Sequence, residues 1–189
     1  YQTVKQAYDR QFSLAALPPL GFENTFAMVV RGEDSNSYGV KTLSQAARYT
    51  PGWKVGVGYE FLEREDGFPG LAKTYGLTFR KPPEVMDLGL MYRALIEKKV
   101  DLISGNSTDG LIQKFNLAIL KDDRQYFPPY ETVPIFSRKT LEKYPQVQAA
   151  IEELGGKISA IDMQRLNYEV DAEFRSPETV VRTFLQNLT

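Results

Sequence analysis

The sequence contains no cysteine and no histidine. Without cysteine, the chain cannot form a disulfide, a thiolate nucleophile or a zinc–thiolate site. Without histidine, it lacks the commonest general base and the commonest metal ligand, and no Ser-His or Cys-His catalytic arrangement can form. An enzyme of this composition would have to work with carboxylates. The composition therefore disfavours catalysis, and we expect no enzyme, no cofactor and no metal site.

The chain also lacks a strong charge of either sign and a long apolar run. Its net charge is −1 at pH 7 and its basic residues form no block, so nothing predicts a nucleic-acid partner. No apolar run approaches the roughly 18 residues of a membrane-spanning helix. A content of 42% hydrophobic and 25% charged residues over 189 positions is typical of one medium globular domain or two small lobes.

The chain begins inside an expected helix. Four aromatic or apolar residues near the start lie close to helical spacing: Tyr1, Val4, Tyr8 and Phe12. The first residue is not methionine, so we expect upstream residues that are missing here. This end of the chain therefore gives no indication of the compartment.

The central part of the chain predicts a parallel sheet. Between residues 54 and 104 the pattern gives strand, helix, strand, helix, strand, with the strands at 54–57, 77–80 and 100–104. Such alternation is typical of a parallel sheet covered by helices, and ligands bind such sheets at the carboxyl ends of the strands. Two loops, residues 58–66 and 105–109, leave those ends and are rich in polar residues.

We expect two units in the chain. Residues 24–116 would form a complete α/β lobe, and residues 1–23 and 117–189 would form the C-terminal part of a second, more helical lobe. The segment 106–130 would leave one lobe, cross a hinge and enter the other. The remaining expected elements are strands at 14–17, 26–31, 117–120 and 133–137, helices at 1–12, 42–49, 71–75, 88–98, 140–154, 159–166 and from 177, and loops at 32–39 and 58–70.

Arg64 lies among acids in the first of the two polar loops. Glu60, Glu63, Glu65 and Asp66 surround it in the sequence. The acids could form a dyad for acid–base chemistry, but a solvated turn with one guanidinium among carboxylates is the favoured interpretation. An arginine at the carboxyl end of a strand can bind a carboxylate ligand through both nitrogens, and the alternative is an ordinary surface arginine.

Two turns carry further candidates. The Asp122-Asp123 pair does not have the spacing of a calcium loop, so a polar turn is expected. The segment Ser107-Thr108-Asp109-Gly110 precedes a helix, and backbone amides at such a start attract anions. Capping of that helix by Asp109 or Thr108 is the favoured interpretation, and it is compatible with ligand contact.

Three aromatic residues surround Pro128-Pro129 in a segment without regular structure: Tyr126, Phe127 and Tyr130. Because prolines restrict the backbone, the rings would have fixed directions. They could form a wall for a cationic or apolar ligand. The alternative is a plug of the core below the hinge.

Several segments together resemble a known family. They are residues 23–31 (ENTFAMVVR), 38–43 (YGVKTL), 59–71 (YEFLEREDGFPGL), 107–130 (STDG through DDRQYFPPY), 141–145 (LEKYP) and 166–171 (LNYEVD). In this order they are similar to the glycine betaine/carnitine/choline-binding proteins of osmoprotectant ABC importers, over nearly the whole chain. The resemblance implies an α/β type II periplasmic-binding-protein fold. Two lobes joined by a hinge would hold the ligand between them, and one lobe would be incomplete in this chain.

The resemblance also implies a cage of tyrosines around the quaternary ammonium of the ligand. The tyrosine that follows Asn-Thr in the family is Phe26 here, so the ring is kept and the hydroxyl is lost. The tyrosine that precedes Ser-Thr-Asp-Gly is Asn106 here. Tyr130 ends the FPPY motif as in the family, and Arg64 is the arginine that meets the carboxylate in betaine binders. The ligand-binding residues expected from the resemblance are Asn24, Phe26, Arg64, Asn106, Thr108 and Tyr130.

The departure at Asn106 leaves two interpretations open. Loss of one ring would weaken a cage by on the order of 1 kcal/mol, nearly tenfold in affinity. Alternatively, Asn106 forms a hydrogen bond with a different trimethylated ligand, such as carnitine, a choline ester or ergothioneine. Asn24 lies where the family offers an oxygen to the cationic end of the ligand.

The function implied by the resemblance is the solute-binding component of an ABC importer. It would capture glycine betaine, choline, carnitine or a similar solute and deliver it to the permease subunits. Its place would be periplasmic or extracytoplasmic, free, tethered to the membrane or fused with the permease. A ligand-sensing regulatory domain on the same fold is the alternative, and a carboxylate enzyme is disfavoured by the composition. Open sheet edges in an incomplete lobe would favour self-association.

Overall fold

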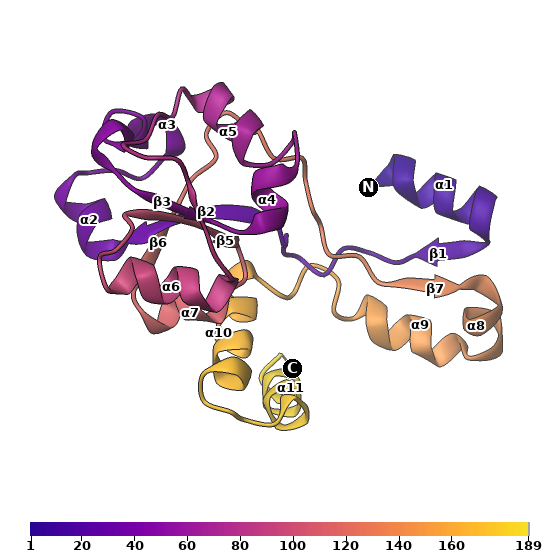
Figure 1. Ribbon diagram of the computed structural model, residues 1–189. Coiled ribbons are helices and arrows are strands. Elements are labelled where there is room, and N and C mark those ends of the chain that lie inside the picture. Colours follow the sequence, from indigo (N-terminus) through magenta and orange to yellow (C-terminus); the bar gives the residue numbers. More distant parts are fainter. Residues whose placement is uncertain (189) are drawn as a thin grey trace.

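The computed structural model describes residues 1–188, which form a five-stranded sheet with helices and a separate two-stranded ribbon with helices (Figure 1). The order in the larger sheet is β4-β3-β5-β2-β6. Its strands are β4 (Glu84–Val85), β3 (Val55–Val57), β5 (Leu102–Asn106), β2 (Phe26–Arg31) and β6 (Leu117–Leu120). β3 pairs in parallel with β4 and β5, whereas β2 runs antiparallel to both β5 and β6. The expected parallel sheet is therefore confirmed for its β4-β3-β5 half.

The strand predicted at residues 77–80 is wrong. The third parallel strand is the short β4 instead. Leu77 follows the left-handed turn at Gly76 and is 6% exposed, and its backbone N–H donates to the carbonyl of Ala72. Phe79 packs its ring against Phe68, with 5.6 Å between the ring centroids. These apolar side chains therefore fill the core from an irregular segment.

Helices cover both faces of this sheet (Figure 1). One face carries α3 (Leu43–Ala46), α4 (Tyr59–Glu63) and α5 (Phe68–Tyr75), and the other carries α6 (Leu88–Ile96) and α7 (Gly110–Lys114). The alternation of β2 explains this layering, because Met28 and Val30 belong to the first core and Ala27 and Val29 to the second. None of the helices within residues 1–188 is both long and apolar enough to cross a membrane.

Two segments expected as loops are helical. Residues 32–37 form α2 (Gly32–Ser37), and the segment 58–70 contains α4 and the start of α5. The helix expected from residue 42 begins with a capping box: the Thr42 side chain accepts a hydrogen bond from the N–H of Gln45, and the Gln45 side chain accepts from the N–H of Thr42 in return. The turn that follows α3 is a short 3-10 helix, η1 (Thr50–Gly52).

The two-stranded ribbon stands apart from the sheet (Figure 1). β1 (Leu14–Ala16) pairs antiparallel with β7 (Ile135–Ser137), and the helices beside them are α1 (Gln2–Phe12), α8 (Arg138–Lys143) and α9 (Pro145–Glu152). One helix was predicted over residues 140–154, but it is broken between Tyr144 and Pro145. Proline has no N–H to continue the first helix and is well placed to begin the second. No residue of α1 is buried.

Three segments connect the ribbon with the sheet. Residues 17–24 lie in the middle and form backbone hydrogen bonds with residues 130–134 on one side, including Leu20 N–H to Thr132 O at 3.0 Å. On the other side, Ile158 N–H donates to Leu20 O at 3.0 Å. Gly21 has a φ of +118°, and a Cβ there would lie 2.8 Å from the carbonyl oxygen of Ile158. The middle segment therefore requires glycine at this point.

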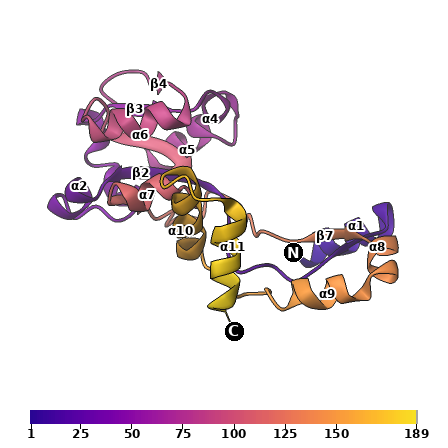
Figure 2. The same ribbon diagram turned by 90° about the horizontal axis from the view of Figure 1, so that it is seen from below.

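The crossing expected in the segment 106–130 lies at its C-terminal end. The structure places β6 in the five-stranded sheet, although it follows the boundary expected at residue 116. α10 (Ala160–Asp171) lies against α7 and is followed by α11 (Pro177–Gln186), on the same side of the molecule (Figure 2). The division into lobes stays a prediction, but β6, α10 and α11 accompany the larger sheet.

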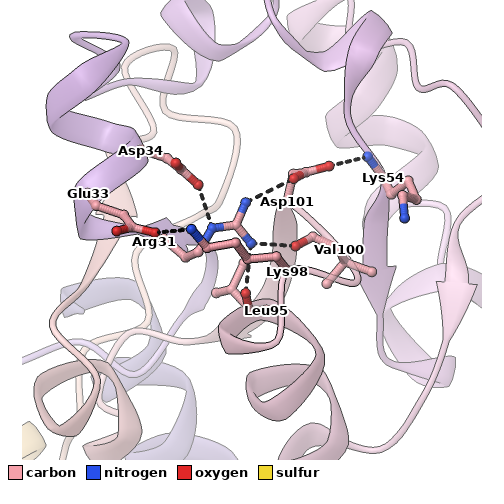
Figure 3. Close-up of polar contacts among 8 residues, drawn as sticks. All are labelled: Arg31, Glu33, Asp34, Lys54, Leu95, Lys98, Val100 and Asp101. Carbon is pink, nitrogen blue, oxygen red and sulfur yellow. Dashed lines mark hydrogen bonds and ion pairs between the residues drawn. The ribbon is translucent and has the colours of Figure 1, made fainter.

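Arg31, the last residue of β2, joins several elements at one end of the sheet (Figure 3). It is 8% exposed. Its guanidinium donates to two carbonyls and two carboxylates: Leu95 O at 2.7 Å, Val100 O at 2.6 Å, Asp34 Oδ2 at 2.5 Å and Asp101 Oδ1 at 2.9 Å. The second oxygen of Asp101 accepts from the N–H of Lys54 at 2.9 Å. One side chain thereby connects the ends of β2 and α6 with the starts of β3 and β5.

Replacement of Arg31 by methionine should lower the free energy of unfolding by about 3 kcal/mol. Methionine keeps much of the apolar stem but leaves two buried carbonyls and the Asp101 carboxylate without their donor. Urea denaturation followed by circular dichroism measures this change. The matched control is Arg93→Met on α6, because Arg93 is exposed and pairs with Glu97 at 3.4 Å. That control should change stability by less than about 0.5 kcal/mol, and equal effects of the two variants would contradict the account.

Candidate functional site

The end of the sheet opposite Arg31 brings several of the expected residues together. Phe26, the first residue of β2, lies directly opposite Asn106, the last residue of β5. Both line a cavity of about 270 Å³ at the carboxyl ends of β3 and β5. The other side chains around it are Tyr59, Glu60, Phe61, Met86, Asp87, Leu88, Met91 and Ser104. This is the edge of the sheet at which the sequence predicted ligand binding.

Aromatic rings form one wall of the cavity. The ring of Phe26 lies 4.6 Å from Phe61 and 6.2 Å from Phe127, measured between centroids. Phe26 is half-buried and also packs against the core. Tyr59 lines the same cavity and is 70% exposed. Sequence reasoning selected the loop of residues 58–66 but missed Tyr59, although its position two residues after the end of β3 was a usable signal.

Asp109 fixes the turn that follows β5. Its Oδ2 accepts from the backbone N–H of Asn106 and from the hydroxyl of Tyr92, both at 2.8 Å. Its Oδ1 accepts from Nδ2 of Asn106 at 3.4 Å. Burial, together with the adjacent Asp109 carboxylate, raises the pKa of the Tyr92 hydroxyl above its usual value. The expected capping role is wrong, because Asp109 precedes α7 but its side chain caps none of the helix N–H groups.

Thr108 and Asn24 contact each other beside the cavity. The hydroxyl of Thr108 donates to Oδ1 of Asn24 at 3.0 Å. Thr108 is 5% exposed, and its carbonyl accepts from Nδ2 of Asn167 on α10 at 2.8 Å. Asn24 is exposed, and its backbone N–H donates to Tyr130 O at 3.1 Å. The pair joins the start of β2, the turn before α7 and α10, and neither residue is among those that line the 270 Å³ cavity.

Arg64 lies at the exposed C-terminal end of α4. Its Nε and Nη2 donate to the two carboxylate oxygens of Asp66 at 2.8 and 2.7 Å, and its Nη1 lies 3.5 Å from Oε1 of Glu60. The hydrogen bonds to Asp66 raise the pKa of the guanidinium and lower the pKa of the Asp66 carboxyl. Tyr130, another of the expected ligand-binding residues, is 48% exposed. The arginine thus already binds one carboxylate in bidentate geometry.

Asp122 anchors the aromatic-proline segment. Its Oδ1 accepts from the N–H of Tyr126 at 3.0 Å and from the hydroxyl of Tyr75, and its Oδ2 accepts from the N–H of Phe127 at 2.9 Å. The expected polar turn is therefore also a half-buried anchor. Tyr126 and Phe127 pack against the core, whereas Tyr130 is exposed. The interpretation as a plug of the core therefore applies to Tyr126 and Phe127, and a ligand-contacting role for Tyr130 stays a prediction.

A second cavity of about 480 Å³ lies between β2, β6 and this aromatic-proline segment. Phe26 and Phe127 line it together with polar residues that include Thr25 and Gln125. The buried hydroxyl oxygen of Thr25 has no hydrogen-bond partner in the described part of the chain. Within residues 1–188, no group of three or more carboxylates is arranged to hold a metal ion.

Comparison with known proteins identifies relatives over the whole chain. The carnitine transport binding protein OpuCC of Listeria monocytogenes is 36% identical over 184 residues, which are 97% of this chain and 59% of the relative. The ergothioneine transport permease/ergothioneine binding protein EgtU of Helicobacter pylori is 35% identical over 188 residues, 100% of this chain and 34% of the relative. The chain thus spans between about a third and three fifths of these two proteins.

Solved structures confirm the predicted fold. A crystal structure described as a glycine betaine/carnitine/choline ABC transporter superposes with a TM-score of 0.93 at 35% identity, over 98% of this chain and 68% of that chain. The YehZ structure from Escherichia coli superposes with a TM-score of 0.84 at 24% identity. The family described as the substrate binding domain of ABC-type glycine betaine transport systems matches residues 1–187. The chain therefore belongs to this family, as the sequence motifs predicted.

Proposed function

We propose that this chain is part of the solute-binding component of an ABC importer and binds a small quaternary-ammonium solute. The observation that carries the proposal is the aromatic-walled cavity at the carboxyl edge of the sheet, with Arg64 3.5 Å from Glu60 of its lining. Membership of the family and the printed names of OpuCC and EgtU support it. The bound solute would lie between the sheet-containing lobe and the ribbon, once the latter is completed.

The cavity has the chemistry that a quaternary ammonium group requires. A trimethylammonium group has no N–H to donate, so it is held by π faces and by negative charge. Phe26, Tyr59 and Phe61 supply rings, and Glu60 and Asp87 supply carboxylates. Each well-placed ring contributes roughly 0.5–2 kcal/mol, so several rings are needed for micromolar binding. Tyr130, which lies in a connecting segment between ribbon and sheet, would place a further ring against the bound ligand.

Arg64 is suited to the other end of a zwitterionic ligand. Its guanidinium binds the Asp66 carboxylate with two nearly equal hydrogen bonds, which is the geometry that a ligand carboxylate would adopt. The side chain is 40% exposed, so a ligand can reach it. On binding, the ligand carboxylate would replace the Asp66 carboxylate at some of the N–H groups of the guanidinium.

The three connecting segments would act as a hinge between the lobes. In a two-state hinge, a ligand that contacts both lobes shifts the population toward the closed form. The closed form would be the one delivered to the permease subunits outside the cytoplasm. The name of EgtU combines a permease with a binding protein, which supports a fused arrangement as one form of this component. The exposed edges of the β1-β7 ribbon would favour self-association when upstream residues are missing.

Titration calorimetry on the full-length protein, with its upstream segment, tests the proposed function. Glycine betaine, choline, carnitine and ergothioneine form the panel. We expect a dissociation constant in the micromolar range or tighter for at least one of them, about −8 kcal/mol or better. No heat of binding from any of the four compounds would contradict the proposal.

Replacement of Arg64 by glutamine separates the two ends of the ligand. Glycine betaine should bind about tenfold to a hundredfold more weakly, because its carboxylate loses a charged partner. Choline has no carboxylate, so its affinity should stay within about twofold. The matched control is Arg182→Gln on α11, an exposed arginine that pairs with Glu178 at 3.0 Å. Equal losses for both ligands would show that Arg64 has no role at the carboxylate.

A further inference from the structure

The side chain of Asn106 has a defined orientation. Its Nδ2 donates to Oδ1 of Asp109, a carboxylate that can only accept hydrogen bonds when ionised. Asp109 is itself held by the Asn106 N–H and the Tyr92 hydroxyl, both at 2.8 Å. A flipped amide would place the Asn106 oxygen against the carboxylate oxygen. Nδ2 of Asn106 therefore faces Asp109.

This orientation leaves Oδ1 of Asn106 free. It forms no hydrogen bond with any of residues 1–188, although the backbone N–H and the Nδ2 of the same residue are both engaged. Asn106 is half-buried and lines the 270 Å³ cavity opposite Phe26. A free amide oxygen at this position is a hydrogen-bond acceptor available to a bound molecule.

Apart from the hydroxyl of Tyr59, the other side-chain polar groups around the cavity are acceptors or are already engaged. Asp87 precedes α6 without capping it, and the carboxylate of Glu60 has one partner, Arg64, at 3.5 Å. The hydroxyl of Ser104 accepts from the N–H of Gly58 at 3.1 Å and lies 3.7 Å from the sulfur of Met91. The one side-chain hydroxyl left without a partner among these described residues is that of Tyr59, which can donate as well as accept. The remaining free groups are acceptors, so the cavity complements a cation that also brings a donor of its own.

We propose that the cavity selects quaternary-ammonium ligands that carry an N–H or O–H donor, and that Oδ1 of Asn106 accepts from it. This inference rests on the proposed function and defines its substrate class. Glycine betaine has no such donor, so it would leave Oδ1 of Asn106 without a partner when the cavity closes. An unsatisfied polar group in a desolvated site lowers affinity, and this penalty creates the selectivity.

The inference is tested with pairs of ligands that differ in one hydrogen-bond donor. Choline and carnitine are each compared with their O-methyl ethers by titration calorimetry on the full-length protein. At least one parent compound should bind about tenfold more tightly than its ether, the usual effect of one buried hydrogen bond. This comparison uses the unmodified protein and does not depend on the folding of a variant.

The variant Asn106→Leu turns this comparison into a thermodynamic cycle that changes both ligand and protein. Leucine is suitable because it has a similar volume and no hydrogen-bond acceptor. It should weaken the parent compound about tenfold and leave its ether within about twofold. Asn187→Leu, at an exposed position after α11, is the control and should change neither affinity. Equal binding of parent and ether in both pairs, or equal losses for both in the variant, would overturn the inference while the proposed function stands. A complete lack of binding by all quaternary-ammonium compounds would overturn both.

Discussion

The buried guanidinium of Arg31 is the interaction on which the arrangement of the larger sheet depends. It lies at one end of β2 and satisfies carbonyls from the end of α6 and from the start of β5, together with two carboxylates. A charged side chain with so little exposure is stable only because its guanidinium donates these four hydrogen bonds. Since this end of the sheet is closed by internal hydrogen bonds, the opposite end of β2 is free to carry loops that bind a ligand.

At that opposite end, carboxylates hold the loops by accepting from backbone N–H groups. Asp109 fixes the turn after β5, and Asp122 fixes the segment that leads to the connecting strands. Each carboxylate also accepts from a tyrosine hydroxyl, Tyr92 and Tyr75 respectively. The rings and the free amide oxygen of the site therefore stand on loops with defined backbone geometry, which reduces the cost of ordering them when a ligand binds.

Much of the fold could be predicted from local sequence. The six residues of β2 are apolar or β-branched except the last, and the strand was predicted with its observed bounds. Residues 77–80 also combine apolar and β-branched side chains, but Leu77 and Phe79 pack from an irregular segment, because core packing does not require a strand. Pro145 was a signal for a break in the helix expected at residues 140–154. It was overlooked because the apolar residues on both sides of it keep helical spacing.

The site was only partly predictable. Motif resemblance selected Phe26, Asn106 and Arg64, and the structure places the first two in one cavity. The ring partners of Phe26 could not be read from spacing, because Phe61 and Phe127 come from distant positions. The anchoring role of Asp122 depends on Tyr75, 47 positions earlier in the sequence, and the orientation of Asn106 depends on the turn geometry that brings Asp109 back to β5. Tyr59 was missed because attention in this segment went to Arg64, five positions later in the sequence.

The central claim is that a solute is bound between two lobes that close on it. The most direct test is small-angle X-ray scattering of the full-length protein, with and without a saturating ligand from the quaternary-ammonium panel. The account predicts a smaller radius of gyration in the ligand-bound protein, because the hinge segments allow the lobes to approach each other. An unchanged radius of gyration, in a sample whose saturation has been verified by calorimetry, would contradict closure of the lobes around the ligand.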